Sequence, residues 1–195
     1  VLLIIFTLVL KIDPWGTIGI FTSLSIILGS LYSLFKKHRN KLNLNFFLIN
    51  NGLIAHLGVG ILIMGITFSS VYKTEYQKNI KVNETLELGK YELKLNKINF
   101  YNEKNFQSLA ANFSLYKNNK FLSNIIPEKR YYYSPKMITT EAGIYHNFFQ
   151  DFYIVLGDKN NESWSIKFYQ NPLINLIWLG AFIMFFSGII TLVKK

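Results

Sequence analysis

The chain has 195 residues, of which 50% are hydrophobic, 16% aromatic and 16% charged, and its formal net charge is +10. Charged residues make up about 25% of an ordinary soluble domain, so this composition disfavours a purely soluble protein. The lack of cysteine excludes disulfides, cysteine-ligated zinc, iron–sulfur clusters and a cysteine nucleophile.

Three long apolar stretches without charged residues are typical of membrane-spanning helices, because about 20 helical residues cross a bilayer. They cover residues 15–35, 46–69 and 172–193. Residues 1–10 are also apolar but are long enough for only about half of the hydrocarbon core. We therefore expect a truncated transmembrane helix at 1–10 and a chain that is the C-terminal part of a longer protein.

Basic residues mark one side of the predicted membrane. Residues 36–45 form a short loop that contains four basic residues and no acidic one, and two lysines follow the last apolar stretch. Such loops stay on the cytoplasmic or matrix side. Residues 70–171 then lie on the outer side, periplasmic or in the intermembrane space, with 14 basic and 10 acidic residues. Because the charge follows the membrane topology, we expect a lipid bilayer as partner and no nucleic acid.

The outer region changes from helical to strand periodicity. Tyr91, Leu93 and Leu95 alternate with polar residues, and the same alternation recurs around Phe113 and Ile166. Turn residues separate these runs, for example at 118–120 and 157–161. The pattern predicts five to seven short strands that form a small β-sandwich or partly open barrel. The expected fold class is therefore a transmembrane helical bundle with an extramembrane β-rich domain.

His56 is the strongest candidate for chemistry, because it lies ten residues into the predicted helix 46–69 and hence near the bilayer midplane. Ionisable residues at that depth are rare and are functional candidates. Gly52 and Gly60 lie four residues away on either side, so both share a helix face with His56. That clearance fits either a closely packed helix or the flat face of a haem whose iron the imidazole binds.

The outer region offers weaker candidates. The run from Pro127 to Pro135 mixes charges with three tyrosines. It is typical of a strand with one solvated face or of a protein-docking surface, in which Arg130 and Tyr132 would be the anchors. Glu141 and Asp151 have no partner at a recognisable spacing, and His146 is expected in a loop or at a strand edge. No acid–base pair is predicted.

An ordered series of segments resembles the C-terminal portion of the cytochrome c haem lyase family, CcmF. The series begins with Gly52–Val59 in a membrane helix and continues to the end of the chain. Its later landmarks are Pro127–Arg130, Met137, Thr140–Ala142, Asp151–Asp158, Trp164, Pro172, Ile177–Ala181 and Gly188.

This resemblance implies a subunit that takes haem from a haem chaperone and joins it to apocytochrome c by thioether bonds, together with other cytochrome c maturation membrane subunits. It implies that His56 is an axial ligand of a transmembrane haem b, and that the catalytic residues and the second ligand lie upstream of this chain. It places the protein in a bacterial inner membrane or, alternatively, in the mitochondrial inner membrane. Two other functions stay open, a transport permease subunit and a structural scaffold of a membrane assembly complex.

Overall fold

The computed structural model describes residues 13–37 and 50–193. These residues fall into two compact units. One is a helical unit that also includes residues 148–150, and the other is a β-domain of residues 74–147 and 151–170. The predicted truncated helix at 1–10 and most of the predicted basic loop at 36–45 lie outside the described residues.

The described residues of the helical unit form three helices, and each is long and apolar enough to cross a membrane. They are α2 (Pro14–Lys37), α4 (Asn51–Val71) and α5 (Asn175–Val193). The start of α2 is fixed by Asp13, whose side-chain oxygen accepts a hydrogen bond of 2.9 Å from the backbone N–H of Gly16. This N-terminal cap and a proline at the first helical position are favourable for helix initiation.

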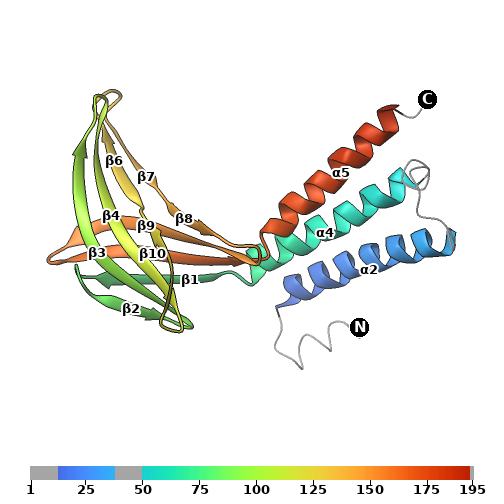
Figure 1. Cartoon of the computed structure of the whole chain (residues 1–195), viewed down its shortest axis with the longest axis horizontal. Helices are drawn as coiled ribbons and strands as arrows, with labels where there is room; N and C mark the ends of the chain where they lie inside the picture. Colours follow the sequence, from blue (N-terminus) through green and yellow to red (C-terminus); the bar gives the residue numbers. More distant parts are fainter. Residues whose placement is uncertain (1–12, 38–49, 194–195) are drawn as a thin grey trace. The chain divides into compact units, whose positions relative to one another are not determined.

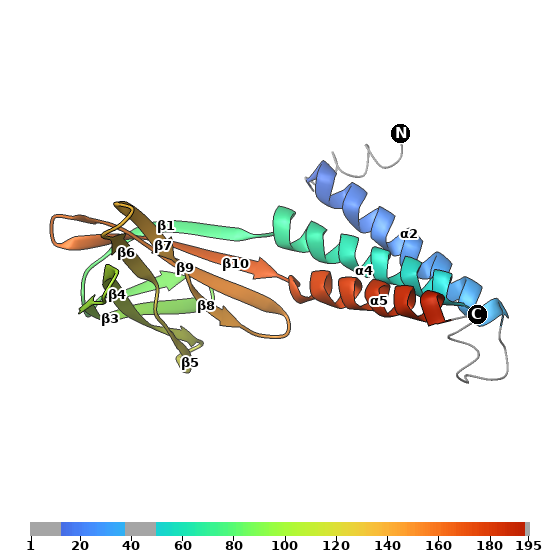
Figure 2. The same ribbon diagram turned by 90° about the horizontal axis from the view of Figure 1, so that it is seen from above.

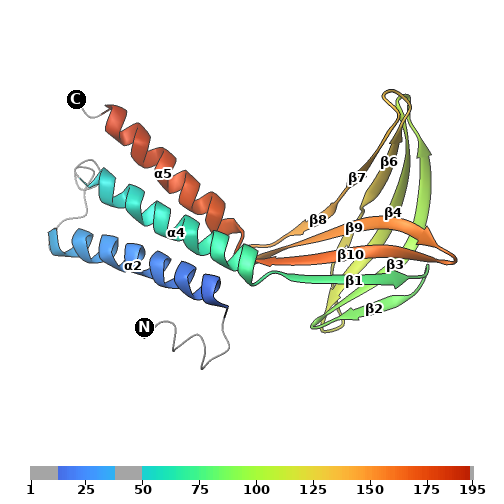
Figure 3. The ribbon, with the colours of Figure 1, turned by 180° about the vertical axis from the view of Figure 1, so that it is seen from behind.

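Helix α4 lies between α2 and α5 (Figures 1 and 3), and glycines bring the backbones together. A Cβ atom at Gly60 would lie 2.7 Å from a side-chain carbon of Ile27 on α2. A Cβ atom at Gly58 would lie 2.9 Å from the carbonyl oxygen of Gly180 on α5. Small residues at such crossings are the usual means of close packing between membrane helices.

Residues 74–172 form ten strands in two sheets, each a separate layer (Figures 1 and 2). One sheet has the order β1-β10-β9-β8, and the other has the order β2-β3-β4-β6-β7, with β5 paired to β4. The four-stranded sheet contains β1 (Thr74–Ile80), β8 (Gly143–His146), β9 (Gln150–Asn160) and β10 (Ser163–Pro172). The six-stranded sheet contains β2 (Thr85–Leu88), β3 (Tyr91–Asn102), β4 (Phe106–Lys117), β5 (Lys120–Ile125), β6 (Glu128–Tyr132) and β7 (Met137–Glu141).

The core of the β-domain lies between these sheets. Leu95 and Phe113 contribute from the six-stranded sheet, and Phe152 and Phe168 from the four-stranded sheet, all of them fully buried. The ring of Tyr91 meets that of Phe152 edge to face, with 4.7 Å between centroids. Burial of these alternating side chains drives the two sheets together.

The predicted fold class, membrane-length helices with a small β-sandwich, is confirmed. The predicted number of five to seven strands is wrong, because ten are present in residues 74–172. The additional strands include β2, β7 and β8, which have four or five residues each. Strands of four or five residues are stabilised by pairing with their neighbours. They are too short to show a clear alternation of apolar and polar residues in the sequence.

Candidate functional site

His56 lies on a face of α4 that neither α2 nor α5 covers. Gly52, His56, Val59 and Ile66 are all exposed and are spaced at three, four and seven residues, so they form one stripe along the helix. Gly58 and Gly65, which contact α5, lie on the opposite face, and Gly60, which contacts α2, borders this stripe. The imidazole is therefore exposed in the described part of the helical unit.

His56 lies near the N-terminal end of α4, and its depth near the bilayer midplane stays a prediction. His56 is five residues beyond the first residue of α4, which corresponds to about 7.5 Å along the helix axis. It thus lies in the N-terminal half of α4 rather than at its centre. The predicted midplane position assumed a helix that starts at Phe46, and residues 46–49 lie outside the described residues.

One hydrogen bond fixes the ring of His56. Its Nδ1 lies 2.9 Å from the carbonyl oxygen of Gly52. A carbonyl oxygen only accepts, so Nδ1 is the donor in this bond, and in the neutral ring Nε2 keeps the lone pair. Histidines that bind metals are usually held in this way, with the other ring nitrogen donating to a backbone carbonyl. The neutral ring could therefore bind a metal through Nε2.

The two glycines on either side of His56 have different surroundings. A Cβ atom at Gly52 would meet no described residue within 4 Å, so the surface beside the ring is open there. The clearance predicted at Gly60 is filled by Ile26 and Ile27 of α2. Gly60 therefore serves helix packing in this structure, and the open surface is confined to the side of Gly52.

Within the described ranges 13–37 and 50–193, no group of three or more His, Cys, Asp or Glu side chains could hold a metal ion. A site formed entirely from these residues is thus absent. The second axial ligand, expected upstream of this chain, stays a prediction.

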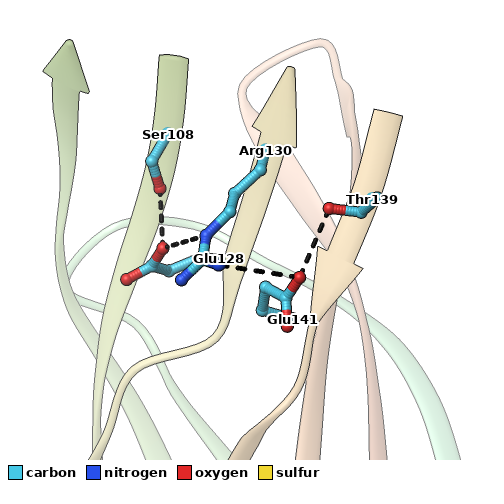
Figure 4. Close-up of polar contacts among 5 residues, drawn as sticks. All are labelled: Ser108, Glu128, Arg130, Thr139 and Glu141. Carbon is cyan, nitrogen blue, oxygen red and sulfur yellow. Dashed lines mark hydrogen bonds and ion pairs between the residues drawn. The ribbon is translucent and has the colours of Figure 1, made fainter. Parts of the chain in front are cut away.

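A polar cluster on the outer face of the six-stranded sheet contains the second candidate, Arg130 (Figure 4). Glu128 accepts hydrogen bonds from Ser108 at 2.9 Å and from Nε of Arg130 at 3.0 Å. Glu141 accepts one from Thr139 at 3.3 Å and lies 3.7 Å from the guanidinium of Arg130. Cross-strand pairing of β4, β6 and β7 places these five residues on one face.

Two aromatic rings extend this cluster along β4 and β6. The guanidinium of Arg130 lies 5.0 Å from the ring centroid of Phe106, and the rings of Phe106 and Tyr132 are 5.3 Å apart. The pKa of Arg130 is raised above its ordinary value, mainly because its guanidinium donates a hydrogen bond to Glu128. The structure thus brings together Arg130 and Tyr132 on one surface and shows that the charge of Arg130 is already paired within the domain.

Sequence reasoning missed the partners of two carboxylates. Glu141 is paired with Arg130, and Asp151 lies 2.8 Å from Nδ1 of His146. Asp151 is buried, and its second oxygen has no hydrogen-bond partner in the part of the chain that is described. Both pairs depend on strand register, β6 with β7 and β8 with β9, which spacing along the sequence does not reveal.

A comparison with protein families decides the relationship of this chain. The family model described as the CcmF C-terminal beta-sandwich matches residues 71–172, which is more than half of the chain and spans the whole β-domain.

The chain belongs to the CcmF family. Among curated relatives, the cytochrome c-type biogenesis protein CcmF of Haemophilus influenzae is 29% identical over 192 residues, which are 95% of this chain and 30% of that protein. The cytochrome c-type biogenesis protein CycK of Bradyrhizobium diazoefficiens is 30% identical over 140 residues, 71% of this chain and 21% of that protein. The chain therefore spans less than a third of the length of these CcmF-family relatives.

A solved structure gives an independent comparison of the fold. The protein titled Cytochrome c Heme Lyase CcmF matches with a TM-score of 0.77 and 14% sequence identity, covering 96% of this chain and 32% of that one. At this identity the likeness concerns the fold alone. This likeness covers both the helices and the β-sandwich that are described above for this chain.

Proposed function

We propose that this chain forms the C-terminal part of a cytochrome c haem lyase subunit, which attaches haem covalently to apocytochrome c during cytochrome c maturation. The match of the family model to the whole β-domain carries this proposal. The names of the relatives, which refer to cytochrome c biogenesis and to a haem lyase, support it. The reaction belongs to the whole protein, and none of the residues discussed above is assigned a catalytic role.

In this proposal His56 is an axial ligand of a haem b in the membrane. The surroundings of the ring fit such a group, since Nδ1 is held by Gly52, His56 is exposed and the surface beside Gly52 is open. A ring nitrogen left without a partner in hydrocarbon costs about 2–7 kcal/mol, so the exposed face of α4 favours a ligand at this position.

Residues of this chain would hold the haem and fix its orientation. The backbone carbonyl of Gly52 keeps His56 in one tautomer, and the absence of a side chain at Gly52 leaves room for a flat ring. When bound, the haem supplies one-electron chemistry at its iron, with a potential that the axial ligand tunes.

The location and partners follow from the same assignment. Three helices of membrane length and bacterial relatives support an inner membrane protein of a bacterium, and a mitochondrial inner membrane is the alternative. The proposed partners are apocytochrome c, a haem chaperone and other membrane subunits of cytochrome c maturation.

Substitution of His56 tests the proposed function. In the purified full-length protein, we expect His56→Ala to remove the absorbance of the b-type haem and to abolish accumulation of cytochrome c in cells, because the iron loses an axial ligand. Absorbance spectra and haem staining of cytochrome c are the measurements.

The matched controls replace the other two of the three histidines in the chain, as His38→Ala and His146→Ala, and should keep the spectrum of the unchanged protein. Equal b-type absorbance in all variants would show that His56 is not the ligand. A colourless unchanged protein that is dispensable for cytochrome c would favour a transport permease subunit or a structural scaffold instead.

The outer face around Phe106, Arg130 and Tyr132 is the proposed docking surface for apocytochrome c or another maturation subunit. Tyrosine and arginine are enriched among the residues that dominate protein interfaces. Arg130 is held in place by two carboxylates and a ring, so it can contact a partner with little further loss of conformational freedom.

Tyr132→Ala is therefore expected to reduce co-purification of the partner, with a loss of about 2 kcal/mol or more of binding free energy. Tyr131→Ala is the matched control, since Tyr131 is the preceding residue of β6 and faces the other side of the sheet. Pull-down from solubilised membranes measures the difference. Identical recovery with both folded variants would exclude Tyr132 from the interface.

A further inference from the structure

The connection between β8 and β9 contains two adjacent exposed aromatic residues. Phe148 and Phe149 follow each other there, are 73% and 68% exposed, and stack edge to face with 5.2 Å between ring centroids. The β3–β4, β4–β5 and β9–β10 turns consist instead of charged and amide residues, namely Glu103, Lys104, Asn105, Asn118, Asn119, Asn161 and Glu162. Exposure of two adjacent phenylalanine rings to water is energetically unfavourable. We therefore expect an apolar environment around Phe148 and Phe149.

These two residues belong to the helical unit rather than to the β-domain. The carbonyl oxygen of Phe149 accepts a hydrogen bond of 2.7 Å from the backbone N–H of Leu173. The carbonyl oxygen of Phe148 accepts one of 3.2 Å from the side-chain amide of Asn175, the first residue of α5. The backbone of these two residues is thus held at the N-terminal end of α5.

The same end of the helical unit carries the aromatic residues expected at a membrane surface. Contacts of Gly19 with Thr67 and of Gly65 with Ile177 show that the start of α2, the end of α4 and the start of α5 lie together. Trp15, Tyr72 and Trp178 are exposed at these three helix ends. Tryptophan and tyrosine accumulate at the level of lipid headgroups, so these residues mark the outer membrane–water interface.

We propose that Phe148 and Phe149 insert into the outer leaflet of the bilayer and act as an interfacial anchor beside α5. The partner is lipid, because the rings are tied to a helix end at the level of Trp15, Tyr72 and Trp178 and have no polar atoms to meet water or a polar partner. The inference rests on the membrane-spanning role of the helices within the proposed function and is independent of haem binding.

Labelling at single cysteines tests this insertion. The 195-residue chain has no cysteine, so Phe148→Cys and Phe149→Cys each create one labelling site in it. With an environment-sensitive fluorophore on the full chain in liposomes, we expect a blue-shifted emission, strong quenching by lipids with a spin label in the upper acyl chain, and weak quenching by aqueous iodide.

Two further positions separate the possible outcomes. Phe121→Cys is the aqueous control, because Phe121 is 55% exposed beside the turn Lys117–Lys120. Phe185→Cys is the lipid control, since Phe185 is 60% exposed in the middle of α5. If iodide quenches the label at positions 148 and 149 as strongly as at position 121, the anchor is refuted. It is also refuted if neither quencher reaches the labels at 148 and 149 because a protein covers them. If 185 also responds to iodide, the membrane assignment itself fails.

Discussion

Gly180→Leu is expected to separate α5 from α4 and to prevent stable accumulation of the protein in the membrane. A Cβ atom at this position would lie 2.6 Å from the carbonyl oxygen of Gly58 and 2.7 Å from the backbone nitrogen of Leu62. Both atoms belong to the backbone of α4, so no change of side-chain rotamer can relieve the clash. Overpacking of a well-packed core typically costs about 1–3 kcal/mol, and a clash with backbone belongs at the upper end.

The amount of membrane-inserted protein and the Tm of the purified protein measure this effect. Gly188→Leu is the matched control on the same helix, because a Cβ atom there would meet no described residue within 4 Å. The control should insert and melt like the unchanged protein. Equal accumulation of both variants would mean that the close approach of α4 and α5 at Gly180 does not stabilise the helical unit.

The fold class was predictable because its signals are local in sequence. A bilayer demands long apolar helices, and a half-buried sheet demands alternation, so α2, α4, α5, β3 and β4 could be anticipated from hydropathy alone. The turn at Asn118 and Asn119 was also visible, and both residues adopt the positive φ angles, 49° and 61°, that suit asparagine in a tight hairpin. Such features need no knowledge of distant residues.

The candidate sites were predictable only in part, because helix crossings and strand register bring distant residues together. Helical spacing put Gly52, His56 and Gly60 on one face, yet it could not show that α2 crosses α4 at Gly60 and leaves Gly52 open. In the β-domain, the pairing of Arg130 with Glu141 follows from the register of β6 and β7. Neither fact has a signature in the spacing of the residues themselves.

The core of the β-domain depends most on its large rings, and Phe113→Ala is expected to destabilise it strongly. Phe113 is fully buried on the central strand β4, where it pairs with Leu95 of β3 and with Ile125 of β5. Truncation removes a large apolar surface and leaves a cavity that the flanking strands cannot close. Substitutions of this kind cost about 3–5 kcal/mol.

Denaturant unfolding of the full chain in detergent, followed by tryptophan fluorescence, to which Trp164 in β10 contributes, measures the loss. Phe121→Ala is the matched control four residues past the end of β4, since its side chain is more than half exposed, and a change of about 0.5 kcal/mol is expected. If the two variants unfold at the same denaturant concentration, burial between the sheets does not hold the sandwich together. A selective effect of Phe113 would show that the β-domain is stabilised by its own core, so that substitutions at the outer face around Arg130 can be interpreted as effects on partner binding.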